Sequence, residues 1–304
     1  MFQKVISGAW IPRMSNLLRT VALLGVVALP AAWLGLWLGG WIPGATLALL
    51  TAAMAYLYCA PVVLRLYRAR EVDARSAPHL LAMVRELARL AGLATPRVFV
   101  LDEASPNAFV TGSRARRASL VLTSGLLHLL DESELRAVLA HEFAHVLRGD
   151  MLPASLAAAA GGLLAAAAQA GYASADDARA GAWAAPLWLL LAPLVALLVR
   201  VGGSAGKEFA ADRLGAQLCG DPEAMASALH QLRPGADGPG AFGLAARYPA
   251  GAQLMFDDPL RRRGLLRLFR THPPRAERVR ALRELAGVAG AGSAPAVLEQ
   301  PFER

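Results

Sequence analysis

The chain has 304 residues, 56% of them hydrophobic, and a mean hydropathy of +0.40. These values argue against an ordinary soluble domain and favour a protein partly embedded in lipid. The net charge is +8, but the basic residues are scattered and not interleaved with aromatic residues, so we expect no nucleic-acid binding. The two cysteines, Cys59 and Cys219, provide no disulfide framework.

Two uncharged apolar runs near the N-terminus predict a transmembrane hairpin. They cover residues 21–38 and 45–64, and the turn between them is expected at residues 39–44. A cleavable signal peptide is the competing interpretation of the first run. The length of the run, its tryptophans and the second run directly after it favour a membrane span.

Two later apolar runs, 152–172 and 183–201, predict a second transmembrane pair. The first of them is rich in alanine and glycine, so it could instead form a buried or re-entrant helix pair. Basic residues flank the runs on one predicted side of the membrane. By the positive-inside rule, both ends of the chain would face the cytoplasm of a bacterial cell. These residues are Lys4, Arg13, Arg19, Arg65, Arg68, Arg70, Arg200 and Lys207.

A small α+β unit is expected between the two transmembrane pairs. Leucines at helical spacing predict a helix at 78–91, and short apolar runs predict strands at 97–101, 107–112 and 119–123. The second of these strands could lie at a sheet edge and bind an extended substrate by strand addition. A plain core strand is the alternative. The candidate strand consists of Asn107, Ala108, Phe109, Val110, Thr111 and Gly112.

The sequence HEFAH at residues 141–145 predicts a metal site. His141 and His145 are four residues apart, so on a helix they lie on one face, about 5–6 Å apart at Cβ, and can bind one tetrahedral Zn²⁺. Asp131 as N-cap, Glu134 three residues later and Gly149 at the end predict that helix. Glu142 is then the candidate general base for a metal-bound water.

A third ligand is needed, because a bare HExxH pattern also occurs by chance on surface helices. Glu208, in the segment KEFAAD at 207–212, would complete a His₂Glu site. Asp212, one helical turn later, would accept a hydrogen bond from a ligand histidine and so fix its orientation. An ordinary solvated helix face is the alternative for both carboxylates.

With PNAFVTG at 106–112, THPP at 271–274 and the two metal motifs around paired apolar runs, the chain resembles the HtpX-type membrane zinc metalloproteases. These are gluzincins related to the CAAX prenyl endopeptidases, and the resemblance extends to about residue 285. It implies one Zn²⁺ per chain on His141, His145 and Glu208, with Glu142 catalytic. It also implies cytoplasmic quality-control proteolysis.

The resemblance further implies a catalytic role for His272 and Arg278. In the related prenyl endopeptidases, a histidine and an arginine at this spacing help to stabilise the tetrahedral intermediate. The alternatives are a capping or packing histidine and an arginine on a helix surface.

Further helices are expected at 222–232 and 274–285, and these complete the predicted organisation. We expect a mainly helical α+β fold with a small β-sheet beside the metal helix and about four transmembrane helices. The predicted parts are a hairpin (1–64), the first part of a catalytic domain with the HExxH helix (65–151), a second transmembrane pair (152–202) and the second part of the catalytic domain (203–304).

The expected function is that of a zinc metalloendopeptidase in the inner membrane, with misfolded or membrane proteins as substrates in a stress response. Its partners would be polypeptides and the lipid bilayer, and the oligomeric state is left open. A CAAX-type prenyl endopeptidase would need more spanning helices around a chamber. A non-catalytic zinc-stabilised membrane adaptor would bind metal without cleavage. A transporter would need ionisable residues inside its spans, and these are nearly absent.

Overall fold

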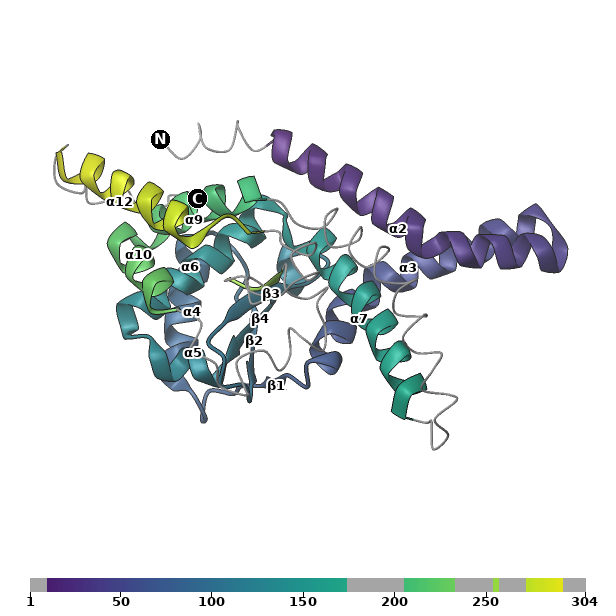
Figure 1. The fold of residues 1–304 in the computed structure, drawn as a ribbon, viewed down its shortest axis with the longest axis horizontal. Helices are drawn as coiled ribbons and strands as arrows, with labels where there is room; N and C mark the ends of the chain where they lie inside the picture. Colours follow the sequence, from purple (N-terminus) through teal and green to yellow (C-terminus); the bar gives the residue numbers. More distant parts are fainter. Residues whose placement is uncertain (1–9, 174–204, 233–253, 257–271, 292–304) are drawn as a thin grey trace, which may run out of the picture.

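The structure is a computed structural model that describes residues 10–173, 205–232, 254–256 and 272–291 (Figure 1). A long helical hairpin projects from a body in which helices surround a small sheet. The elements in chain order are α2 (Trp10–Gly39), α3 (Trp41–Leu66), β1 (Arg70–Glu71), α4 (Pro78–Leu90), β2 (Arg97–Leu101), β3 (Ala108–Thr111), the 3-10 helix η1 (Ala115–Arg117), β4 (Ser119–Thr123), α5 (Ser124–Leu129), α6 (Glu132–Arg148), α7 (Met151–Ala173), α9 (Ala205–Cys219), α10 (Pro222–Gln231) and α12 (Arg275–Ala291).

The hairpin consists of α2 and α3, and only Gly40 separates them. Gly40 has φ +91°, a left-handed conformation that glycine adopts without steric cost, so the turn is shorter than the predicted 39–44. The segments Met14–Gly39 and Trp41–Leu66 are long and apolar enough to cross a membrane. Most of their large apolar side chains, including Trp37 and Leu49, are exposed on the outside of the hairpin.

The other predicted spans are described only in part. Residues 152–172 lie in α7, which follows α6 after a bend of 98°, and this bent pair has the composition of a broken span or a re-entrant loop. The described residues therefore contain two candidate spans, or three if the bent pair counts as one. The run at 183–201 lies outside the described residues, so the expectation of about four spans stays a prediction.

The sheet has four strands in the order β1-β2-β4-β3. β2 and β4 are parallel, whereas β1 pairs with β2, and β3 with β4, in antiparallel orientation. The three predicted strands are confirmed, with β3 shortened to Ala108–Thr111. The two-residue strand β1 was not predicted, because so short a segment carries no periodic pattern.

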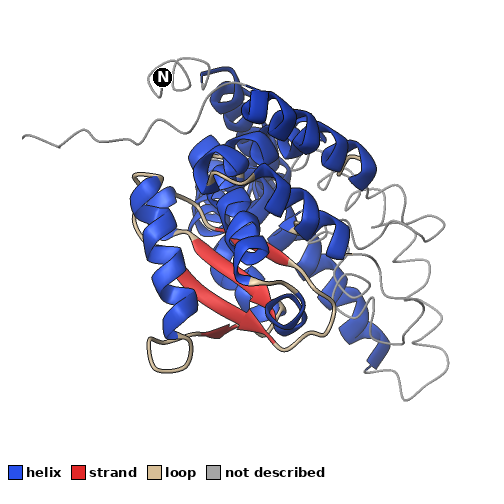
Figure 2. Cartoon of the chain, turned by 90° about the vertical axis from the view of Figure 1, so that its left-hand side faces the viewer, coloured by secondary structure: helices blue, strands red, loops and turns tan. Residues whose placement is uncertain are grey.

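Helices lie on either side of the strands (Figure 2), and apolar side chains pack on both faces of the sheet. On one face, Val98 and Leu120 belong to a core that includes side chains of α4, α6 and α10. On the other face, Phe99 and Val121 pack with Val63 of α3 and with residues of α7. The sheet thus lies between the helix of the HExxH motif and the base of the hairpin.

Helix α6 begins and ends where its sequence predicts. Asp131 Oδ1 accepts a hydrogen bond from the Glu134 amide at 2.9 Å, and the Asp131 amide donates to Glu134 Oε2 at 3.2 Å. This reciprocal pair is a capping box. Gly149, with φ +72°, ends the helix in a left-handed conformation. These two signals fix which residues of the motif lie on which helical turn.

Candidate metal centre

Three predicted ligands converge in the body of the protein. The Nε2 atoms of His141 and His145 are 3.0 Å apart, and Glu208 places Oε2 3.5 Å from the first and Oε1 3.6 Å from the second. Ligands bound tetrahedrally to zinc at 2.0–2.1 Å would be about 3.4 Å from one another. Among the described residues, this is the group of His, Cys, Asp and Glu side chains that has the geometry to hold a metal ion.

A glycine lets the two ligand-bearing helices approach closely. A Cβ atom at Gly215 of α9 would lie 2.8 Å from the backbone nitrogen of His141 and 2.9 Å from its Cα. These separations are shorter than real Cβ contacts, so a larger residue would push α9 away from α6. Glu208 and Asp212 lie two turns and one turn before Gly215, respectively, on the same side of α9, and the close approach therefore brings both carboxylates to His141.

The carboxylates of Glu142 and Glu208 are both buried, but their surroundings differ. Burial raises the pKa of Glu142, whose two side-chain oxygens have no hydrogen-bond partner among the described residues. Burial also disfavours ionised Glu208, but the charges of His272 and the other neighbouring basic groups outweigh burial and hold the pKa of Glu208 well below its usual range. Carboxyl groups with opposite shifts suit different tasks: a lowered pKa suits the predicted role of Glu208 as an anionic ligand, and a raised pKa suits the predicted role of Glu142 in proton transfer.

Asp212 and Arg278 support His141 from behind. Asp212 Oδ1 lies 2.9 Å from His141 Nδ1, and Arg278 donates to both oxygens of Asp212, at 2.7 and 2.6 Å. Burial would raise the pKa of Asp212, but Arg278 outweighs it and lowers this pKa to about 2. Burial likewise opposes a charge on His141, yet Asp212 and Glu208 raise its pKa to about 9. The two carboxylates thus create a negative potential at the ring, which would also favour a metal cation in place of the ring proton.

The structure brings His272 and Arg278 to the candidate metal centre. His272 Nε2 and Arg278 Nη1 each lie 3.7 Å from Glu208 Oε2. Arg278 is only 1% exposed, so the alternative of a surface arginine is wrong. Arg278 also donates from Nη1 to the carbonyl of Phe256 at 2.8 Å. The catalytic role of the two residues stays a prediction.

The predicted substrate strand β3 lies next to a short segment of the chain, residues 254–256. β3 is the last strand of the described sheet, and its four residues are buried. The amide of Phe256 donates to the carbonyl of Ala108 at 2.8 Å, and the Phe256 ring packs edge-on against His141 with a centroid distance of 4.7 Å. Residues 254–256 therefore lie between β3 and the candidate metal centre. Substrate binding along residues 107–112 stays a prediction.

Three residues at the site are absent from the sequence analysis: Asp150, Gly215 and Phe256. Asp150 directly follows the glycine that ends α6, a position from which a carboxylate can reach back to the last helical turn, and this was the available signal. Burial would raise the pKa of Asp150, but His145 and Lys207 outweigh this effect and lower it. Gly215 and Phe256 act through tertiary contacts, which a single sequence does not display.

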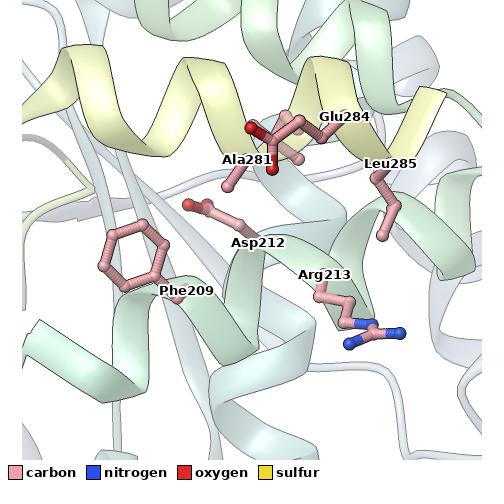
Figure 3. A pocket seen from close by; sticks show the side chains of 7 residues that line it. Phe209, Asp212, Arg213, Ala281, Glu284 and Leu285 are labelled. Carbon is pink, nitrogen blue, oxygen red and sulfur yellow. The ribbon is translucent and has the colours of Figure 1, made fainter. Parts of the chain in front are cut away.

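A hollow lies between α9 and α12, behind the candidate metal centre (Figure 3). It contains none of the three ligands and meets the site only through Asp212, so its position does not suggest a substrate cleft. The labelled residues that line it are Phe209, Asp212, Arg213, Ala281, Glu284 and Leu285.

Comparison with known proteins agrees with this geometry. Residues 74–286 match the model of peptidase family M48. The chain belongs to peptidase family M48. Proteins named "Protease HtpX homolog" from Burkholderia thailandensis and Ralstonia pickettii are 40% identical to this M48 chain, over 90% of its length and 98% of theirs. The homologue from Methylibium petroleiphilum is also 40% identical, over 88% of this chain and 97% of its own.

The resemblance to HtpX-type metalloproteases is thus confirmed. Membership of family M48 supports the prediction that the chain is a metalloprotease. Among solved structures, the M48 chain is similar to the crystal structure of S. mikatae Ste24p, with a TM-score of 0.45 and 18% identity. That alignment covers 91% of this chain and 67% of the other.

Proposed function

We propose that this M48 protein is a membrane-bound zinc metalloendopeptidase that cleaves misfolded or membrane proteins on the cytoplasmic side of a bacterial inner membrane. Such an activity would serve protein quality control under stress. The observation that carries the proposal is the convergence of His141, His145 and Glu208 beside Glu142, a buried carboxylate whose oxygens have no partner among the described residues.

In the proposed mechanism, the two histidines and Glu208 hold the metal. Zinc in such a site lowers the pKa of a water molecule and polarises the substrate carbonyl. Glu142 accepts the proton of the attacking water and then delivers it to the leaving amine. Burial shifts the pKa of Glu142 upward, and this direction suits the exchange. A group that both accepts and donates a proton works best when its pKa lies near the pH of the reaction.

His272 is the proposed donor to the negative charge that develops on the carbonyl oxygen. A donor in a site of low dielectric constant contributes several kcal/mol, on the order of 3, to such charge stabilisation. Arg278 gives two of its N–H groups to Asp212, so we assign it mainly to holding Asp212, and through it His141, in place. An extended substrate would pair with β3, where it would replace the hydrogen bond from Phe256 to Ala108.

The hairpin supports the membrane assignment. The outward apolar side chains of α2 and α3 suit lipid, and residues 20–64 contain no Asp, Glu, Lys, Arg or His. The basic residues on either side of the hairpin support the cytoplasmic orientation. The run at 183–201 would add a further span.

The test compares wild type and Glu142→Gln, purified in detergent, for zinc content and for cleavage of casein and of a prenylated CAAX peptide. We expect zinc in both proteins and casein cleavage in wild type, reduced about 10²–10⁴-fold or more in the variant. Glu132→Gln makes the same change at an exposed site of the same helix and should keep full activity.

Other outcomes assign other functions. Casein cleavage retained in Glu142→Gln would refute the general-base role. Zinc without cleavage of either substrate would favour the adaptor, and cleavage of the prenylated peptide alone would favour a prenyl endopeptidase. A wild-type protein without zinc would refute the metal site.

A further inference from the structure

Asp150 is a buried carboxylate beside the ligands that belongs to none of the motifs. It is 4% exposed, and its Oδ2 lies 3.4 Å from His145 Nδ1. The same oxygen accepts a hydrogen bond from Arg148 Nε at 2.9 Å. The Asp150 amide also donates to the His145 carbonyl at 3.1 Å, so the main chain itself fixes this carboxylate relative to the ligand.

The other oxygen of Asp150 connects the site to the first candidate membrane span. Asn16, a buried residue of α2, donates from Nδ2 to Asp150 Oδ1 at 2.9 Å and to the Arg148 carbonyl at 3.3 Å. Lys207 Nζ lies 3.6 Å from the same oxygen, and Lys207 directly precedes Glu208. One carboxylate thus contacts a metal ligand, the neighbour of another ligand and a polar group of α2.

The two ligand histidines have parallel supports. Asp212 lies at Nδ1 of His141 and is held by Arg278, whereas Asp150 lies at Nδ1 of His145 and is held by Asn16 and its basic neighbours. A carboxylate at the distal ring nitrogen fixes the tautomer and the orientation of a metal-binding histidine. Only the second support comes from the hairpin.

We propose that Asp150 is a positioning residue for His145 and that Asn16 holds it, so that the first membrane helix takes part in metal binding. The inference rests on the proposed function only in requiring that the site binds zinc. It gives a partner to the buried Nδ2 group of Asn16 within the candidate span Met14–Gly39, where burial without a hydrogen bond would be unfavourable.

The test uses the full-length protein in detergent and compares wild type with Asp150→Asn, Asn16→Ala and the double variant. Thr46→Ala is the control, because the Thr46 hydroxyl donates to the Ile42 carbonyl of its own helix at 2.9 Å and, among the described residues, has no hydrogen bond to the metal centre. The measurements are zinc affinity, by competition with a chromophoric chelator, and the visible spectrum of the Co²⁺-substituted protein. A purely structural contact would change neither in a folded variant.

We expect Asp150→Asn to lower zinc affinity about 10–100-fold and to change the Co²⁺ spectrum. Asn16→Ala should change both in the same direction by a smaller factor, and the double variant should match Asp150→Asn, because Asn16 acts through Asp150. Thr46→Ala should equal wild type.

Two results would overturn the inference. One is a zinc affinity of Asn16→Ala equal to that of Thr46→Ala. The other is a double variant whose loss is the product of the two single losses. Both leave the proposed function intact if wild type binds zinc and cleaves casein, whereas wild type without zinc would overturn both proposals.

Discussion

The helix of the HExxH motif and the hairpin are both rich in apolar residues, but these residues are buried in the first and mostly exposed in the second. On α6, Leu139 is 0% exposed and packs in the core, whereas on α3, Leu49 is 72% exposed. The sequence already distinguishes the strongly apolar hairpin from α6, which carries several charged residues, and the structure adds what covers the apolar side chains of each. Exposed apolar side chains along the charge-free stretch 20–64 indicate a lipid surface, and buried ones on a helix that also carries charged residues indicate a protein core.

The two regions meet at the base of the hairpin. Leu23 of α2 and Val63 of α3 are buried and belong to the same core as Phe99 and Phe109 of the sheet. The hairpin is therefore apolar for two reasons: its base is part of the protein core, and its tip presents apolar groups outward.

The largest expected effect is on the free energy of unfolding, which should respond differently to truncation of a side chain in α6 and in the hairpin. Leu139→Ala removes a fully buried side chain and should lower the free energy of unfolding by about 2–5 kcal/mol. Leu49→Ala should leave it nearly unchanged, because its side chain makes little contact with the rest of the protein. The measurement is chemical unfolding in one detergent, and equal losses for both variants would show that the hairpin is packed like the body.

The next prediction compares two glycines, Gly215 of α9 and Gly25 of α2. Gly215→Ala places a methyl group against the backbone of His141, so we expect it to cost about 1–3 kcal/mol of stability and to weaken zinc binding. A Cβ atom at Gly25 of α2 would meet no atom within 4 Å. Gly25→Ala should therefore be neutral or stabilising by up to about 1 kcal/mol. Thermal unfolding and chelator competition test both, and unchanged zinc affinity in Gly215→Ala would refute the role of the close approach.

The smallest expected effect is on the free energy of unfolding at acidic pH. Arg136 of α6 donates to Glu86 of α4 at 2.9 and 2.7 Å and lowers the pKa of Glu86 from 4.5. A lowered pKa in the folded state means that the contribution to stability is present above about pH 4.5 and is lost as the pH falls below it. Because the pair is partly exposed, we expect no more than about 0.5 kcal/mol.

Glu86→Gln should remove this part of the difference in unfolding free energy between pH 7 and pH 4. Asp102→Asn, at an exposed carboxylate directly after β2, serves as the control. A difference that is the same in Glu86→Gln and wild type would show that the ion pair contributes nothing.

The sequence predicted those parts that depend on local signals. The capping pair Asp131 and Glu134 and the glycine after Arg148 determine the limits of α6, and the runs at 97–101 and 119–123 determine two strands. The spacing of His141 and His145 predicted two members of the group that the structure brings together, and the residues of the KEFAAD segment predicted Glu208 as the third. Residue type and spacing carry this information, because one helical turn sets which side chains share a face.

What the sequence did not predict depends on contacts between distant segments. The described part of α2 extends from Trp10 to Gly39, beyond the apolar run at 21–38 that predicted the span, because a helix can continue past its apolar stretch into polar residues. Asn16 reaches Asp150 across 134 positions of sequence, and no local pattern relates them. The approach of α9 to α6 at Gly215 and the hydrogen bond from Phe256 to β3 are of the same kind.

The ligands of the candidate metal centre lie on both sides of α7 in the sequence, and this order has a consequence during synthesis. The ribosome makes the hairpin and α6 first, so a growing chain already carries His141 and His145 while it inserts into the membrane. Glu208, Asp212 and Arg278 follow only after α7. Since a catalytic zinc site requires three protein ligands, the proposed site would stay incomplete until most of the chain has been translated.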